Sequence, residues 1–204
     1  MLYEDEIVGK DAEKKAPTVT DQKRKAEKGN SMKGTLLLVR DIAIAVAVLI
    51  IILQFYKPTI VFEHSMEDTL HPEDYVFLAR QAYNFGEVEH GDIVVFESKL
   101  LDERGGYKSL IKRAIGLPGE IIEVKDGAVY RNGERLSESY VRGGTTPGEM
   151  APVKVPEESF FVLGDNRMVS MDSRTSEVGF VSMDKIKGKV VFRLFPLSTA
   201  GAVR

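Results

Sequence analysis

The sequence contains no cysteine, and histidine occurs only three times in 204 residues. The absence of cysteine excludes disulfides, thiolate chemistry and cysteine-based zinc sites. The histidines, at positions 64, 71 and 90, match no paired metal-ligand spacing, so we expect no metal site. A basic excess is also missing, because the net charge is -3. A binder of phosphate backbones normally carries such an excess, so we expect no nucleic-acid partner.

The remaining composition is that of a folded protein with appendages. Hydrophobic residues make up 43% of the chain and charged residues 29%, which is enough apolar material for a core. The length fits one domain of ordinary size. Residues 1–33 are polar and densely charged, and they predict a disordered or loosely helical tail.

A long apolar stretch begins at Gly34, contains the run IAIAVAVLIIILQF and ends at Tyr56. It has about the 20 residues needed to cross a bilayer. A buried helix of a soluble protein is disfavoured because the segment is apolar on every face and Arg40, near one end, can reach the membrane interface. A cleaved signal peptide is disfavoured because a long charged segment precedes the run and no Ala-x-Ala site follows it. We therefore predict one transmembrane helix over residues 34–56, in contact with the lipid bilayer.

The charges that flank this stretch predict its orientation. Residues 23–41 contain six Lys and Arg against two Asp and Glu, whereas residues 57–76 contain one against five. Basic flanks stay in the cytoplasm. We therefore expect a cytoplasmic N-terminus and an extracytoplasmic domain over residues 57–204.

That domain has the pattern of a mainly β structure. Two dipeptides between apolar runs, Asp126-Gly127 and Asn132-Gly133, suit the positive φ angles of tight hairpin turns. Short strands with regular turn signals predict an antiparallel barrel or sandwich-like domain. The runs expected to form strands are TIVF, YVFLA, DIVVFE, LIKRAI, EIIEV, AVYRN, SFFVL and KVVFRLF.

Ser65 lies in the segment VFEHSMEDTL, about nine residues beyond the apolar stretch. Nine extended residues span only about 30 Å, so any chemistry at Ser65 takes place close to the membrane surface. A serine by itself is usually a turn or capping residue. Its neighbour His64 is badly placed to act as its base, because adjacent residues of an extended chain point to opposite faces.

Lys112 lies in the segment SLIKRAIGLPGE, where apolar residues accompany it on its strand face. Most such lysines are salt-bridged or extend to solvent at a sheet edge. The alternative is burial, which can lower a lysine pKa from about 10.4 by several units. A neutral amine could then take the proton of a serine hydroxyl. Arg113 cannot do this, because a guanidinium does not deprotonate in a protein.

A third segment, GDNRMVSMDSR over residues 164–174, has the composition of a structured turn. Asp172 and Arg174 could pair and fix this loop, and Asp165 could brace the turn. Ser170 could hydrogen-bond a neighbouring lysine amine and so fix its direction, which matters because a nucleophile and its base must meet at roughly 2.6–3.2 Å.

Taken together, these three segments resemble the catalytic motifs of bacterial type I signal peptidases. Their order, spacing and position after an N-terminal anchor agree, and the resemblance extends from about residue 34 to the C-terminus. The residues that carry it are Ser65-Met66-x-x-Thr69-Leu70, Lys112 to Glu120 (KRAIGLPGE) and Gly164 to Arg174 (GDNRxxSxDSR).

The resemblance implies a fold of antiparallel coiled sheets, a serine endopeptidase activity and no cofactor. That family removes signal peptides from secreted preproteins at the outer face of the bacterial cytoplasmic membrane, cutting after small residues in an Ala-x-Ala pattern. It implies Ser65 as nucleophile and Lys112 as general base. Ser170 would orient the lysine, and Asp172 with Arg174 would support the site.

Two positions depart from the family pattern. Many members carry Ser or Gly two residues before the nucleophile, where a hydroxyl can help hold the oxyanion. This chain has Glu63, whose carboxylate must face away, be protonated or lower activity. Asp68 stands where the family usually has proline, which leaves the turn after Ser65 less rigid.

Two alternatives remain at this point. A self-cleaving regulator of the LexA-like class would use similar Ser-Lys chemistry, but it would be expected to carry a DNA-binding helix-turn-helix in place of the apolar stretch. An anchored β-domain that binds extracytoplasmic partners without catalysis would make Lys112 merely structural.

Overall fold

A computed structural model describes residues 19–84 and 86–203, with side chains from residue 34. The chain divides into two compact units, Met1–Ile50 and Ile51–Arg204. The predicted tail over residues 1–33 falls largely outside the described part, since residues 1–18 are not described.

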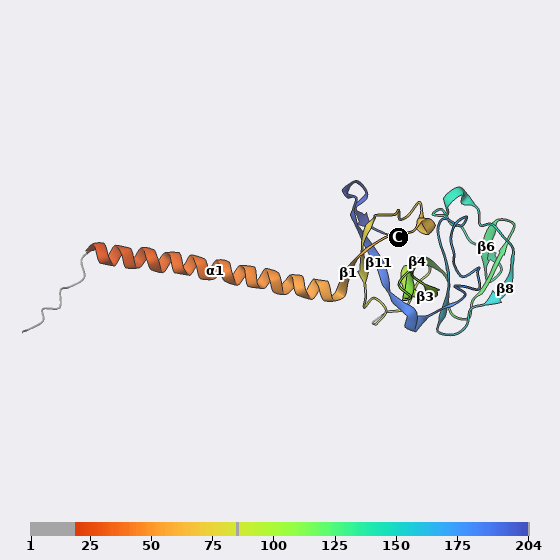
Figure 1. Cartoon of the computed structure of the whole chain (residues 1–204), viewed down its shortest axis with the longest axis horizontal. Coiled ribbons are helices and arrows are strands. Elements are labelled where there is room, and N and C mark those ends of the chain that lie inside the picture. The colour runs from red at the N-terminus through yellow and green to blue at the C-terminus, as the bar shows by residue number, and fades with distance from the viewer. Residues whose placement is uncertain (1–18, 85, 204) are drawn as a thin grey trace, which may run out of the picture. The chain divides into compact units, whose positions relative to one another are not determined.

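A single long helix, α1, runs from Val19 to Phe55 (Figure 1). Its part from Gly34 to Phe55 is long and apolar enough to cross a membrane, and its side chains are exposed. The predicted apolar helix is therefore present. It ends one residue before the predicted limit, because Tyr56 is the first residue of a strand.

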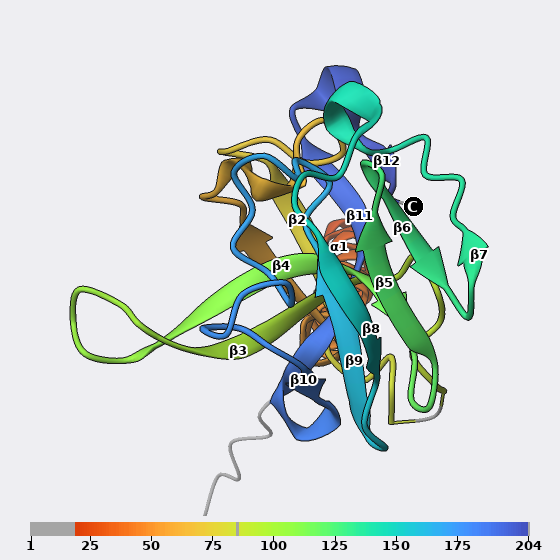
Figure 2. The ribbon, with the colours of Figure 1, turned by 90° about the vertical axis from the view of Figure 1, so that its right-hand side faces the viewer.

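The larger of two antiparallel sheets has the strand order β1-β2-β11-β3-β4-β9-β10, with β12 also paired to β11. In Figure 2, the loop of the β3–β4 hairpin extends away from the other strands. The strands are β1 (Tyr56–Ile60), β2 (Tyr75–Ala79), β3 (Ile93–Leu101), β4 (Tyr107–Gly116), β9 (Ser159–Leu163), β10 (Val181–Ser182), β11 (Ile186–Phe195) and β12 (Gly201–Ala202).

The smaller sheet has four strands in the order β7-β6-β5-β8. They are β5 (Ile121–Lys125), β6 (Ala128–Arg131), β7 (Glu134–Arg135) and β8 (Met150–Lys154). The mainly antiparallel β-domain is thus confirmed. Over the residues that the structure describes neither sheet closes on itself, so the barrel-like aspect of the prediction does not extend to a closed barrel.

The two predicted turn dipeptides form hairpins in the smaller sheet. Asp126 and Gly127 have φ angles of 51° and 70° and join β5 to β6. Asn132 and Gly133 have φ angles of 54° and 84° and join β6 to β7. Asn, Asp and Gly adopt these angles more readily than other residues, which is why the turns could be recognised in advance.

Three apolar clusters form the core, and β4 contributes to all of them. Leu110 and Ala114 pack in one cluster, Ile111 lies against a second, and Ile115 belongs to a third. Consequently β4 is buried on both faces from Lys112 onward. We expected one face of this strand to meet the core, but the structure buries both, because different apolar clusters pack against its side chains and one of them includes residues of the second sheet.

Four short strands were not predicted: the two-residue strands β7, β10 and β12, and the five-residue strand β8. Two-residue strands leave no alternation to detect, and the proline at position 152, within β8, argues against a strand there.

Gly188 lies at a bulge of β11, where the backbone of β2 approaches closely. A Cβ there would lie 2.5 Å from the Ala79 carbonyl oxygen, and the residue has a φ of 148°. We expect Gly188→Ala to lower the free energy of unfolding by about 1–3 kcal/mol, because backbone atoms must move. Thermal unfolding of the full chain in detergent measures the effect. Gly201→Ala is the control, since nothing lies within 4 Å of its Cβ position. Equal melting temperatures for the two variants would contradict the packing argument.

Candidate active site

Ser65 lies in a short 3₁₀ turn, His64–Met66, that follows β1. The turn is held to the core by Met66 and Leu70, which are almost fully buried in one apolar cluster. Its backbone is also held from outside the segment, because the Asn166 N–H donates to the Ser65 carbonyl at 3.0 Å. Ser65 is therefore a fixed residue with a side chain that is largely buried.

Lys112 extends from β4 to the hydroxyl of Ser65. Its Nζ lies 2.7 Å from Ser65 Oγ and donates to the Ile111 carbonyl at 3.1 Å. The residue is completely buried. The structure thus brings together the two side chains that the sequence suggested as nucleophile and base, at the distance that proton transfer requires.

Burial lowers the pKa of Lys112 from its ordinary value of 10.5 to about 8. The dominant cause is desolvation of the ammonium form, and Glu63 and Asp172 oppose it by raising the pKa. Lys108 lowers it further, and Asp165 has a smaller raising effect. At neutral pH an appreciable fraction of the amine, about a tenth, is therefore unprotonated.

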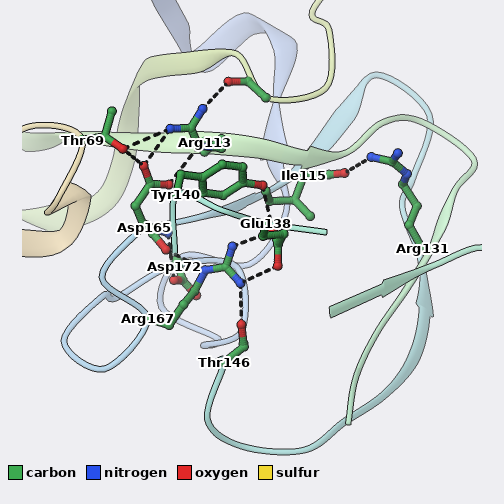
Figure 3. A network of polar contacts seen from close by, with 12 residues as sticks. Thr69, Arg113, Ile115, Arg131, Glu138, Tyr140, Thr146, Asp165, Arg167 and Asp172 are labelled. Carbon is green, nitrogen blue, oxygen red and sulfur yellow. Dashed lines mark hydrogen bonds and ion pairs between the residues drawn. The ribbon is translucent and has the colours of Figure 1, made fainter. Parts of the chain in front are cut away.

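Arg113, the next residue, points to another part of the structure and is fully paired (Figure 3). Its Nε and one terminal nitrogen donate to the two oxygens of Asp165 at 2.9 and 2.7 Å. Thr69 donates its hydroxyl to the same carboxylate at 2.5 Å. The Tyr140 ring lies 4.0 Å from the guanidinium carbon. Asp165, predicted only to brace its turn, in fact connects all three sequence motifs.

Asp172 and Arg174 form the predicted pair. Arg174 Nε donates to Asp172 Oδ1 at 2.8 Å, and the other carboxylate oxygen accepts the Gly164 N–H at 3.1 Å. Arg174 also donates to the Arg167 carbonyl at 2.8 Å. Through these contacts, Asp172 and Arg174 link the two ends of the loop over residues 164–174.

Ser170 does not make the hydrogen bond to Lys112 that we expected. Its hydroxyl oxygen is buried and has no hydrogen-bond partner within the described part of the chain. The hydroxyl packs closely against Gly164, where an added Cβ would lie only 2.3 Å from it. The hydrogen bonds that the structure does give the Lys112 amine go to Ser65 and Ile111.

The loop over residues 164–174 is also supported by three residues that the sequence did not point to. Glu138 accepts from two nitrogens of the buried Arg167 at 2.7 and 3.1 Å, and the Tyr140 hydroxyl donates to Glu138 at 2.8 Å (Figure 3). Thr146 accepts from Arg167 at 2.5 Å. Glu138, Tyr140 and Thr146 lie outside the three motifs, so no local pattern could have identified them.

The two departures from the expected pattern are accommodated differently. Asp68 is exposed, and the turn after Ser65 is held instead by Glu67, which pairs with His64 at 2.8 Å and with Arg142. His64 is therefore occupied away from Ser65, as its side chain is 68% exposed. The Glu63 carboxylate does not face away from the site, because one of its oxygens lies 3.9 Å from Lys112 Nζ.

A cavity of about 350 Å³ lies beside Ser65. Apolar side chains form much of its wall, and its charged lining residues are Glu63, Asp102 and Lys108. Within the described residues no group of three or more His, Asp or Glu is arranged to hold a metal. The cavity can therefore bind an apolar segment next to the Ser65 hydroxyl, which contacts the Lys112 amine.

Comparison with known proteins defines the class: the chain is a serine peptidase, a hydrolase of peptide bonds. The family model described as signal peptidase, peptidase S26, matches residues 34–195. The chain therefore belongs to the signal peptidase S26 family, whose members remove signal peptides from preproteins. This membership decides against the non-catalytic anchored domain.

Two curated relatives agree with this assignment, and one solved structure is also similar in sequence. Signal peptidase I of Bacillus licheniformis is 36% identical over 183 residues, which cover 84% of this chain and 95% of the relative. Signal peptidase I T of Bacillus subtilis (strain 168) is 35% identical over 169 residues, covering 78% and 84%. A crystal structure of a signal peptidase I from Enterococcus faecalis V583 is 34% identical, with a TM-score of 0.42, and covers 51% of this chain and 97% of that chain.

Removing the Asp165 carboxylate should destabilise the fold strongly. In Asp165→Ala the Arg113 guanidinium keeps its charge in a buried position without its counterion, which costs about 3–5 kcal/mol. Urea unfolding of the full chain in detergent measures this loss. Asp184→Ala is the control, because Asp184 pairs with Lys185 on the surface and should contribute about 1 kcal/mol or less. Comparable losses in both variants would refute the role of the buried pair.

Lys112→Met should be at least as stable as the parent at pH 7. The folded chain lowers the Lys112 pKa from 10.5 to about 8, so the buried ammonium costs about 3 kcal/mol below pH 8. Between about pH 8 and 10.5 the unfolded chain binds more protons at this residue, so the parent gains stability relative to the variant as pH rises. Urea unfolding at pH 7 and pH 10 measures the difference. A markedly less stable variant at pH 7 would contradict a desolvated lysine.

Proposed function

We propose that this chain is a signal peptidase I that uses Ser65 as nucleophile and Lys112 as general base. The observation that carries the proposal is the 2.7 Å separation of Lys112 Nζ and Ser65 Oγ in a buried environment. A lysine at its ordinary pKa is protonated and cannot accept a proton at neutral pH, whereas a desolvated amine can.

The chemistry follows from this pair. The Ser65 oxygen attacks the scissile carbonyl carbon while the neutral Lys112 amine takes the hydroxyl proton. The resulting ammonium gives that proton to the leaving amine as the peptide bond breaks, which leaves an ester on Ser65. The mature chain leaves with its new amino terminus in this step. Water then attacks the ester while Lys112 accepts a proton from it, the ester bond breaks, and Lys112 returns the proton to Ser65 Oγ, so that the signal peptide leaves with a new carboxylate. From this segment the Ser65 backbone N–H is the donor available to the oxyanion.

Cleavage after an Ala-x-Ala pattern is part of the proposal. In an extended substrate, residues two apart point to the same side. Small side chains at the first and third positions before the cut can therefore both face the cavity beside Ser65, which is lined by Ile60, Val95 and Ile111 among others. Its volume of about 350 Å³ suits two small side chains together with adjoining backbone.

We also propose that residues 34–56 anchor the enzyme in the bacterial cytoplasmic membrane. The charge asymmetry on either side of this segment supports a cytoplasmic N-terminus and an extracytoplasmic catalytic domain over residues 57–204. The substrates would then be secreted preproteins, met where their signal peptides leave the bilayer. The short chain between Phe55 and Ser65 keeps the nucleophile close to the anchor.

The purified full chain in detergent should cleave a preprotein after Ala-x-Ala. Ser65→Ala, Lys112→Ala and Lys112→Arg should each reduce kcat/KM at least about a hundredfold without unfolding the protein, because each removes the nucleophile or a base that can be neutral. In the parent, kcat/KM should rise with pH through about 8, where Lys112 loses its proton. Mass spectrometry of the products and circular dichroism of the variants provide the measurements.

His64→Ala serves as the control for this experiment. It removes the other candidate base next to Ser65 and should leave most of the activity, because the His64 ring is directed to Glu67. The dyad would be wrong if Lys112→Ala kept near-normal turnover or if His64→Ala alone abolished it. A preprotein with a bulky residue immediately before the cut should not be processed.

A further inference from the structure

The Glu63 carboxylate sits between two lysine amines beside the nucleophile. One oxygen lies 2.5 Å from Lys108 Nζ, and the other lies 3.9 Å from Lys112 Nζ. All three residues belong to the neighbourhood of Ser65, and Glu63 and Lys108 both line the adjoining cavity. Glu63 and Lys108 are partly exposed, at 37% and 45%, whereas Lys112 is buried.

The charged groups that act on Lys112 come from three segments. Glu63 precedes the Ser65 turn, and Lys108 lies four residues before Lys112 on β4. Asp172 and Asp165 belong to the loop after β9. The residue opposite Lys112 on the neighbouring strand β3 is the apolar Val94.

The acids in this set differ in how firmly they are held. Asp165 and Asp172 are fully buried and each receives two or more hydrogen bonds from an arginine. Glu63 has no arginine partner among the described residues, and its closest cation is the partly exposed Lys108. Its position relative to the Lys112 amine therefore depends on Lys108.

We propose that Lys108 is a positioning residue that holds the Glu63 carboxylate out of direct contact with the Lys112 amine and so keeps that amine available as the base. This inference rests on the proposed function of Ser65 and Lys112. Without Lys108, the cation nearest to Glu63 is Lys112 itself, and a rotation of the Glu63 side chain closes the remaining gap. A direct ion pair would stabilise the ammonium form and occupy the site where Lys112 must accept the Ser65 proton.

The role of Lys108 can be tested by the pH dependence of preprotein cleavage. In Lys108→Met the acid limb of kcat/KM should move to higher pH by about one unit, which lowers kcat/KM at pH 7 about tenfold. Lys108→Arg should restore the parent profile, because it keeps a cation for Glu63. Glu63→Gln alone should move the limb to lower pH. The double variant Glu63→Gln/Lys108→Met should recover most of the activity that Lys108→Met loses.

Lys125→Met is the matched control. Lys125 is a similarly exposed lysine that pairs with Glu123 at 2.8 Å, but it lies on β5 in the smaller sheet. Its loss changes the net charge by the same amount and should leave the profile unchanged. This control separates a local contact from a general effect of charge.

The inference is overturned if Lys108→Met gives the parent profile, if it raises KM alone, or if adding Glu63→Gln fails to restore activity. These outcomes leave the Ser65–Lys112 pair intact, provided that Ser65→Ala and Lys112→Ala are inactive. Failure of the proposed function has a different signature, since those two variants would then still cleave the preprotein.

Discussion

Two adjacent cations, Lys112 and Arg113, are buried on the same strand, and the structure treats them in opposite ways. The guanidinium cannot lose its charge, so it is buried only together with the Asp165 carboxylate, which meets it through two parallel hydrogen bonds. The amine can lose its charge, and no carboxylate meets it at hydrogen-bond distance in the described structure. Its burial therefore appears as a lowered pKa. This contrast places an amine with a lowered pKa, the base that we propose, next to a guanidinium that stays charged and paired.

The ion pair of Arg113 helps to fix the position of Lys112 relative to Ser65. Asp165 joins β4 to the loop after β9 and, through Thr69, to the segment that carries Ser65. The same loop holds the Ser65 carbonyl through Asn166. The proposed nucleophile and base, Ser65 and Lys112, thus share one set of contacts, although 47 residues separate them in sequence. A desolvated lysine costs about 3 kcal/mol of stability, and the hydrogen bonds that Asp165 makes with Arg113 and Thr69 help to offset such a cost.

The sequence predicted those features that depend on local patterns. The apolar helix, most strands and the two hairpin turns follow from composition, alternation and the φ preferences of Asn, Asp and Gly. Motif order identified Ser65 and Lys112 as candidates for contact. The burial of both faces of β4 was not predictable, because alternation cannot show that a second sheet covers the strand. The expected hydrogen bond from Ser170 to Lys112 is absent for a related reason: the direction of the Ser170 hydroxyl depends on how its loop packs against Gly164. Glu138 and Tyr140 come from a connection outside the motifs and act only through tertiary contacts.

The Glu63 carboxylate, two residues before Ser65, is compatible with the proposed role of Lys112 as a base. Desolvation alone can lower the pKa of a fully buried lysine to about 5–6. Such an amine is neutral at physiological pH but is a weak proton acceptor, and general base catalysis is most effective when the pKa lies near the working pH. Glu63 raises the pKa of Lys112 against desolvation, whereas Lys108 lowers it, and the result is about 8. A carboxylate in this position therefore has two opposing consequences. It strengthens Lys112 as a base while reducing the neutral fraction, and its distance from the amine determines which consequence prevails.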